Sequence, residues 1–218
     1  MCGELDGDDV RWKIVTDRAR FEQLRTDPRF HAVVALGRTV NALRFVQMPL
    51  ISHEHDESPA ATRAKYNSLF FSCALYSEGY LLVQKLKKHF AEEPLFQVLT
   101  EATIKNPKAQ EALKWSIVAL RNKLVFHFDI DEVGRKLQQV NLDEIIFVSG
   151  LGNMNAQVHY ELGDHCAWQT LYDPLKAEGD VTQIMSRAEQ INDLIVTFSQ
   201  AAEEFMVDYL NSTGWHRE

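Results

Sequence analysis

The chain has 218 residues, of which 45% are hydrophobic, and its formal net charge is −8 at pH 7. This size and apolar content fit one large domain with a substantial core, and they exclude global disorder. The negative charge argues against an extended, nonspecific nucleic-acid surface, which needs clustered Lys and Arg. A local phosphate site needs only one or two cations and is compatible with this charge.

Cysteine usage and hydropathy predict where the protein resides. Cys2, Cys73 and Cys166 have neither paired nor metal-knuckle spacing, which fits a reducing cytosol better than a disulfide framework. The acidic N-terminus lacks the basic flank and apolar core of a secretory signal, and no apolar run reaches the roughly 18 residues of a membrane span. We expect a soluble cytoplasmic protein without a membrane partner: a single domain over 1–218 whose residues 1–10 form a flexible leader.

Helical signals dominate the first half of the chain. A short helix is expected at about 16–25. Asp27 and Ser58 are each followed by proline, so they are expected to cap helices over about 28–49 and 59–89. Pro49 is expected to end or kink the first of these two helices. Its core-facing stripe has three- and four-residue steps: Val33, Leu36, Val40, Leu43, Val46 and Leu50.

The helix expected at 59–89 is apolar on two faces, which is typical of the middle of a bundle. One face carries Leu69, Cys73, Tyr76, Tyr80 and Val83, and the other carries Phe71, Ala74 and Leu82. Glu78 falls on the second face and is therefore a candidate buried carboxylate, which needs a cationic or hydrogen-bonding partner. A structural ion pair is favoured over a supporting role in catalysis.

The loop over 51–58 contains His53, His55, Asp56 and Glu57, which could in principle hold a metal ion. Neighbours in a flexible loop seldom fix coordination geometry, and no helical His pair accompanies them. We favour a solvated loop, and we predict neither a metal nor any other cofactor.

The second half predicts more helices and one β element. Short helices are expected at about 94–104 and 131–142, and a hairpin at 145–161 within an insertion over 144–176. A closing helix over about 180–210 has an unbroken apolar stripe: Ile184, Ala188, Ile191, Ile195, Phe198, Ala202, Phe205 and Tyr209. The fold class is therefore mainly α, a bundle of about five to seven helices with a small β-hairpin insertion.

A further helix, capped by Asn106-Pro107, carries the strongest chemical signal of the sequence. Its core stripe is Leu113, Ile117, Leu120 and Leu124. Near its end stands Arg121-Asn122, followed by His127, at the border of that stripe. This segment resembles the active-site signature of the HEPN superfamily, in which Arg, often followed by Asn, Asp or His, precedes His by four to six residues.

The resemblance implies a small, commonly dimeric helical bundle and, in many members, a metal-independent endoribonuclease of toxin–antitoxin or phage-defence systems. It implies that Arg121, Asn122 and His127 of each subunit line a cleft at a homodimer interface. It further implies RNA as the substrate and an antitoxin protein as a possible partner.

The residue types suit RNA cleavage without a metal. A His titrates near neutrality and can take the proton of the 2′-OH, while the forked donors of an Arg can stabilise the phosphorane. Six residues of straight helix turn a side chain through about 600°, so Arg121 and His127 would not share a face. Either the helix ends near Phe126, or the Arg of one subunit serves the His of the other.

Competing interpretations remain open. Arg25 and His31 have the same spacing, but they straddle Pro28 and Thr follows the Arg. Arg121 could instead pair with Glu78 or Asp129, while His127 caps a helix C-terminus. The chain would then be a noncatalytic HEPN-like protein that binds a nucleotide or a protein. A third, weaker interpretation is a metalloprotein that uses the His53 and His55 loop.

Overall fold

The computed structural model describes residues 14–118, 130–138, 149–150, 158–159, 162, 166 and 181–217. The chain is mainly α, as the sequence predicts. The helices are α1 (Arg18–Leu24), α2 (Pro28–Ser52), α3 (Pro59–Phe90), α4 (Pro94–Ala102), α5 (Pro107–Ala112), the π-helical η1 (Leu113–Ile117), α7 (Ile130–Leu137) and α9 (Val181–Ser212).

The helix starts follow the predicted capping chemistry. Asp27 Oδ1 accepts a hydrogen bond from the backbone N–H of Arg29 at 2.8 Å, and Ser58 Oγ accepts one from that of Ala61 at 3.3 Å. Asn106 Oδ1 likewise accepts from the N–H of Lys108 at 3.0 Å. Each cap satisfies an N–H that has no partner within the helix, so these short sequences fix the helix starts.

Pro49 does not end α2, contrary to one of the two expected outcomes. The helix continues to Ser52, and the N–H of His53 still donates to the carbonyl of Pro49 at 3.1 Å. A proline removes only its own N–H, so the following turn keeps its hydrogen bonds.

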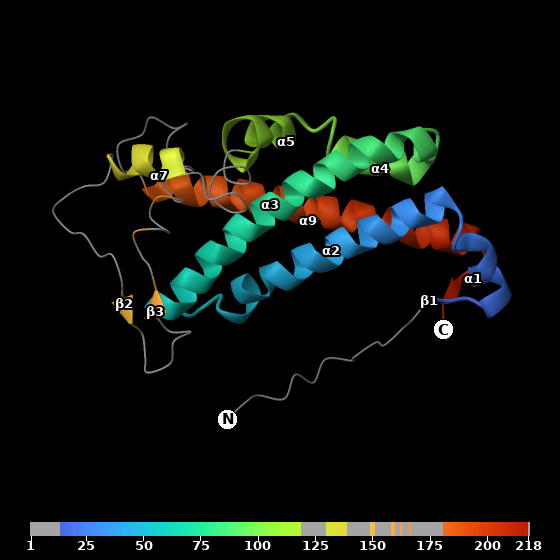
Figure 1. The fold of residues 1–218 in the computed structure, drawn as a ribbon, viewed down its shortest axis with the longest axis horizontal. Coiled ribbons are helices and arrows are strands. Elements are labelled where there is room, and N and C mark those ends of the chain that lie inside the picture. Colours follow the sequence, from blue (N-terminus) through green and yellow to red (C-terminus); the bar gives the residue numbers. More distant parts are fainter. Residues whose placement is uncertain are drawn as a thin grey trace, which may run out of the picture.

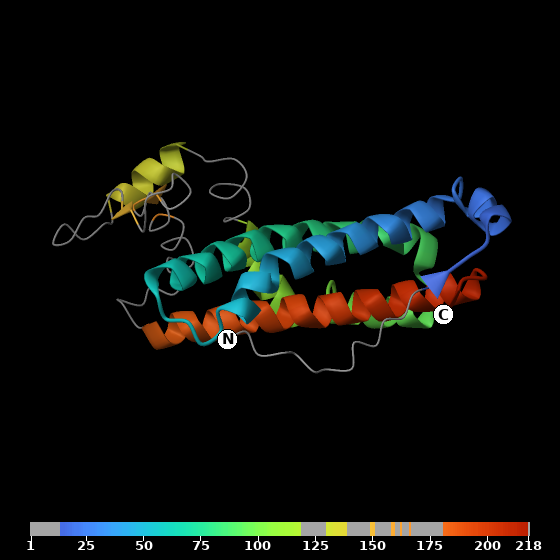
Figure 2. The ribbon, with the colours of Figure 1, turned by 90° about the horizontal axis from the view of Figure 1, so that it is seen from below.

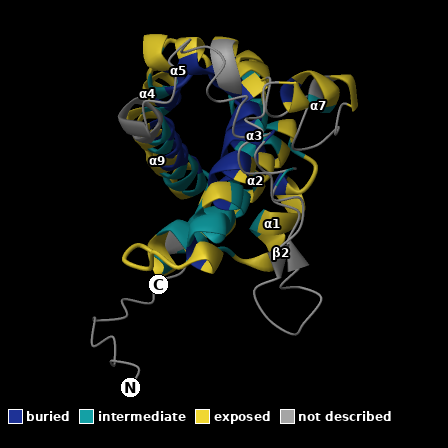
Figure 3. Ribbon diagram, turned by 90° about the vertical axis from the view of Figure 1, so that its left-hand side faces the viewer, coloured by how far each residue is buried: buried dark blue, intermediate teal, exposed yellow. Residues whose placement is uncertain are grey.

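The three long helices form the body of the bundle. Figure 1 shows α2 and α3 side by side, and Figure 2 shows α9 running along the opposite side of that pair. The buried faces of these helices turn toward one another in the end-on view of Figure 3. Every member of the predicted α9 stripe from Ile191 onward is buried. The shorter α4 also packs on α9.

Two contacts fix the pairing of α2 with α3. Ser68 Oγ donates a hydrogen bond to the carbonyl of Val46, and the Cα of Gly79 lies close to Thr39. As the position on α3 rises from 68 to 79, the matching position on α2 falls from 46 to 39, so the two helices are antiparallel. A Cβ at Gly79 would come within 2.8 Å of the Phe198 ring on α9. Three helices therefore meet at this glycine.

An aromatic cluster joins four helices at the end of the bundle that holds α1. The ring centroid of Phe90 lies 5.8 Å from that of Phe96, 5.0 Å from that of Phe205 and 5.7 Å from that of Tyr209. The guanidinium of Arg29 stands over the Phe90 ring at 4.7 Å and pairs with Glu93. These residues come from α2, α3, α9 and the start of α4, so the cluster determines where these helices converge.

Short strands complete the fold. Ser149–Gly150 (β2) pairs antiparallel with Val158–His159 (β3), inside the range predicted for the hairpin. Ile14–Val15 (β1) pairs antiparallel with His216–Arg217 (β4), which the sequence analysis did not foresee. The leader over 1–10, and most of the insertion over 144–176, lie outside the described residues.

The second apolar face of α3 is only partly buried. Ala74 is buried, but Phe71 is exposed and Glu78 is half-buried. The prediction of a helix buried on both faces is therefore wrong for the edge that holds Phe71 and Glu78. None of the described helices is long and apolar enough to span a bilayer.

Replacement of Gly79 by alanine tests the close approach of α3 to α9. The new methyl group would overlap the Phe198 ring, so we expect the free energy of unfolding to fall by roughly 1–3 kcal/mol. Urea unfolding followed by circular dichroism measures this change.

Gly134 on α7 provides the matched control, since a Cβ there would meet nothing within 4 Å. Gly134→Ala should leave stability unchanged or raise it by up to about 1 kcal/mol. Equal stability of Gly79→Ala and the parent chain would contradict the close approach.

Candidate functional site

The HEPN-like segment directly follows, in sequence, the last described residue of its helix, Val118. Arg121, Asn122, His127 and Asp129 fall in 119–129, outside the described residues. The helix that leads to them is described as far as Val118. It begins at Pro107 behind the Asn106 cap, as predicted. The structure thus describes how the chain approaches the motif.

The approach contains a π-helical turn that the sequence did not indicate. α5 passes at Leu113 into η1, in which the hydrogen bonds close a wider ring than in an α-helix. Both predicted core positions in this part, Leu113 and Ile117, are buried, whereas the next residue, Val118, is 40% exposed. Val118 therefore lies outside the core-facing stripe. Arg121, which the sequence analysis places at the border of this stripe, follows Val118 by three residues.

η1 packs on α3, the helix that carries Glu78. Glu78 is half-buried, and it interacts with another group of the protein. A partly exposed carboxylate on this helix is compatible with the favoured structural ion pair. The supporting role proposed for Glu78 beside Arg121 stays a prediction.

The second Arg-to-His match has a local structural explanation. Arg25 follows the last residue of α1, and its Nε pairs with Glu22 Oε2 at 2.8 Å. His31, in the first turn of α2, places Nε2 2.6 Å from the backbone carbonyl of Arg25. The His thus satisfies a helix-end carbonyl and the Arg pairs with a neighbour one turn away. The two residues belong to the end of α1 and the start of α2. This agrees with the sequence analysis, in which the pair straddles Pro28 and lacks the Asn that follows Arg121.

The loop after α2 is held by its own hydrogen bonds. Lys65 Nζ donates to the carbonyls of Glu54 at 3.3 Å and of Asp56 at 2.9 Å. Asp56 Oδ1 accepts from the N–H of Ser58 at 2.8 Å, and Oδ2 lies 3.6 Å from Nδ1 of His53. The hydrogen bonds from Ser58, aided by His53 and Lys65, lower the pKa of the Asp56 carboxyl. Within the described ranges no group of three or more His, Cys, Asp or Glu side chains is placed to hold a metal ion.

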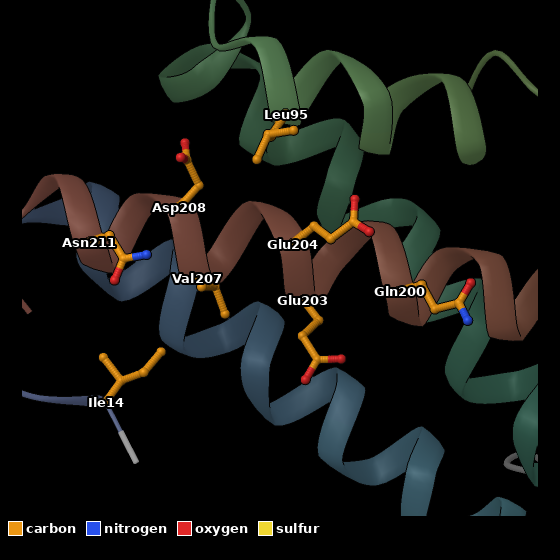
Figure 4. Close-up of a pocket in the computed structure, with 8 residues that line it drawn as sticks. All are labelled: Ile14, Leu95, Gln200, Glu203, Glu204, Val207, Asp208 and Asn211. Atoms are coloured by element: carbon orange, nitrogen blue, oxygen red, sulfur yellow. The ribbon is translucent and has the colours of Figure 1, made fainter. Parts of the chain in front are cut away.

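A broad groove of about 800 Å3 runs along the outer side of α9. Ile14 and Leu95 supply apolar walls, and α9 contributes Glu203, Glu204 and Asp208. In Figure 4, Glu203 points toward α2, where it pairs with Arg44, whereas Asp208 points toward α4. This concentration of carboxylates would repel phosphate, so the groove does not suit RNA.

Cys73 and Cys166 are buried, and the pKa of each thiol is raised. Burial raises the pKa of the Cys73 thiol from 9.0 to about 12, because the interior disfavours the thiolate. Burial also raises the pKa of the Cys166 thiol, although the buried Lys136 on α7 opposes this shift. Neither has the depressed pKa of a nucleophile.

No family model, curated protein or solved structure matches the chain.

Burial of Cys73 predicts very slow alkylation. A pKa of about 12 lowers the thiolate fraction at pH 8 by roughly 1000-fold relative to a thiol of ordinary pKa near 9.0. We expect iodoacetamide to leave Cys73 unlabelled in the folded chain and to label it readily in urea, as measured by peptide mass spectrometry.

The pKa shift also fixes the direction of the pH effect on stability. The unfolded thiol ionises near 9.0 while the buried thiol stays protonated to about 12, so the contribution of Cys73 to stability is complete below 9.0 and is lost as pH rises to 12. Labelling of Cys73 at the same rate with and without urea would contradict the burial.

Proposed function

We propose that this protein is a metal-independent endoribonuclease of the HEPN type, of toxin–antitoxin or phage-defence character. In this proposal Arg121, Asn122 and His127 form the active site, with one such segment from each subunit of a homodimer. RNA is the substrate, and an antitoxin protein is a further possible partner.

The position of the motif on the scaffold carries this proposal. The segment follows directly on a well-capped helix of a mainly α bundle, after a π-helical turn. π-turns within helices are frequent at functional sites. The step from the buried Ile117 to the exposed Val118 supports placement of the following polar residues at an edge of the core. An arginine at such an edge is partly desolvated and still accessible to a phosphate.

The proposed reaction needs only groups that the segment contains. His127 takes the proton from the 2′-OH, whose oxygen attacks the adjacent phosphorus. The bond to the 5′-oxygen then breaks, and the protonated His127 returns the proton to that oxygen. Arg121 stabilises the negative charge of the phosphorane through its paired donors, and Asn122 orients the phosphate or the arginine. The products are a 2′,3′-cyclic phosphate and a 5′-hydroxyl.

A cleavage assay on the purified full chain in EDTA tests the proposal. With a labelled single-stranded RNA, we expect cleavage by the parent chain and a loss of at least about 100-fold in Arg121→Ala and in His127→Ala. An RNA with 2′-deoxy sugars should resist cleavage, because it lacks the attacking oxygen.

The second Arg-to-His match supplies the matched control. Arg25→Ala and His31→Ala remove the same residue types at the same spacing. Arg25→Ala removes only an ion pair with Glu22 of α1, and His31→Ala removes only a contact with the backbone carbonyl of Arg25. Both variants should cleave RNA at the parental rate.

Equal loss in both pairs of variants would show that the assay reports stability and not catalysis. Absence of cleavage by the parent chain would favour the alternative, a noncatalytic HEPN-like protein for nucleotide or protein binding. Cleavage that depends on added metal would favour the metalloprotein.

A further inference from the structure

The outward side of α2 carries large apolar side chains that the bundle does not cover. Phe45 is 77% exposed, Met48 is 55% exposed and Ile51 is 68% exposed. Phe71 on α3, 44% exposed, is about level with Phe45, since Ser68 bonds Val46 and Gly79 meets Thr39. We call these four side chains the α2 patch. Figure 1 shows the two helices that carry it side by side.

The α2 patch is large for a surface that stays in water. An aromatic side chain presents roughly 150–250 Å2, and the side chains of Met and Ile are only slightly smaller. The exposed parts of the four therefore amount to roughly 450 Å2, within the 300–600 Å2 range of the largest and often functional patches on monomers. This is about half of the roughly 800 Å2 that each partner buries in a standard interface. The neighbouring polar side chains would supply the rest.

The sequence of α2 around the patch has the pattern of a helix–helix seam. Exposed residues follow one another at alternating steps of four and three: Val34, Arg38, Asn41, Phe45, Met48 and Ser52. Such spacing keeps one stripe facing a partner helix along several turns. Phe45 and Met48 lie in the middle of this stripe, with polar residues on both sides. That is the layout of an interface with an apolar core and a polar rim.

The charges at the two ends of the stripe have opposite signs. Arg38 lies seven residues before Phe45, about 10 Å along the helix. Glu54 lies at the other end, in the turn that follows Ser52, the last residue of α2. Glu57 extends the acidic end. These three side chains are exposed, and none forms an ion pair within the part of the chain that the structure describes.

An arrangement of opposite charges on the two sides of an apolar centre complements itself. A two-fold axis between Phe45 and Met48 would lay α2 antiparallel on a second α2. Phe45 would then face the partner's Met48, and Asn41 would face the partner's Ser52. Arg38 would approach the acidic segment that follows α2 in the partner.

We propose that the α2 patch is the interface between two copies of this chain, packed antiparallel through α2. The patch shares no residue with the HEPN-like segment, so the proposal stands without the proposed nuclease. Because that nuclease would also be a homodimer, the effect of changes at Phe45 and Met48 on association is what assigns the contact to α2. RNA cleavage is measured separately.

Sedimentation velocity of the full chain over a range of concentrations tests the interface. We expect the parent chain to sediment as a dimer of the 25.0-kDa chain. Phe45→Glu with Met48→Glu should raise the dissociation constant by at least about 100-fold, because four carboxylates would meet at the two-fold axis. Val98→Glu, at a 45% exposed position on α4 outside the patch, is the matched control and should leave the dimer intact.

Charge reversal tests the antiparallel register. Arg38→Glu alone and Glu54→Arg with Glu57→Arg should each weaken the dimer by roughly tenfold or more, and the three changes together should restore it. Unchanged circular dichroism of each variant confirms that these surface changes leave the fold intact.

Three results would overturn the proposal. The first is a monomeric parent chain at about 100 μM, which would leave the patch to an unrelated protein. The second is a dimer that survives Phe45→Glu with Met48→Glu. The third is a triple charge variant that is no better associated than its parents, which would exclude the antiparallel register.

Discussion

The bundle depends on the packing around the Phe90 ring. α2, α3, α4 and α9 meet there, and the ring is contacted by Phe96 of α4 and by Phe205 and Tyr209 of α9. Arg29 covers one face of the ring and pairs with Glu93, so its charge is neutralised while its stem closes the cluster. Because α4 starts beside this cluster and leads into α5, the same packing sets the direction in which the chain runs toward the HEPN-like segment.

Local signals made most of the helices predictable. A capping side chain followed by proline acts within one turn, so Asp27, Ser58 and Asn106 marked their helix starts without knowledge of the fold. Burial was less predictable, since it depends on which elements cover a face. The edge of α3 at Phe71 has the pattern of a core stripe and is nevertheless exposed. The pairing of β1 with β4 joins residues about 200 positions apart and has no local signal at all.

The candidate site shows how much a short motif needs its context. Arg25 with His31 and Arg121 with His127 have the same spacing in sequence. In the first pair, Arg25 pairs with Glu22 one turn away and His31 contacts the backbone carbonyl of Arg25, so local contacts account for both side chains. For the second pair, the sequence predicted the helix and its core positions Leu113 and Ile117, but not the π-helical turn that contains them. The turn packs against α3, and sequence periodicity does not encode such tertiary contacts.

The pairing of Ile14–Val15 with His216–Arg217 brings sequence-distant parts of the chain together at one end of the bundle (Figure 1). A short linker between these strands would span little distance, so we expect a circular permutant that joins them to form the same bundle. The exposed loop between α2 and α3 is a suitable place for new ends, because it lies at the opposite end of α2 from this strand pair. The order of the helices along the chain is thus separable from the bundle that they form.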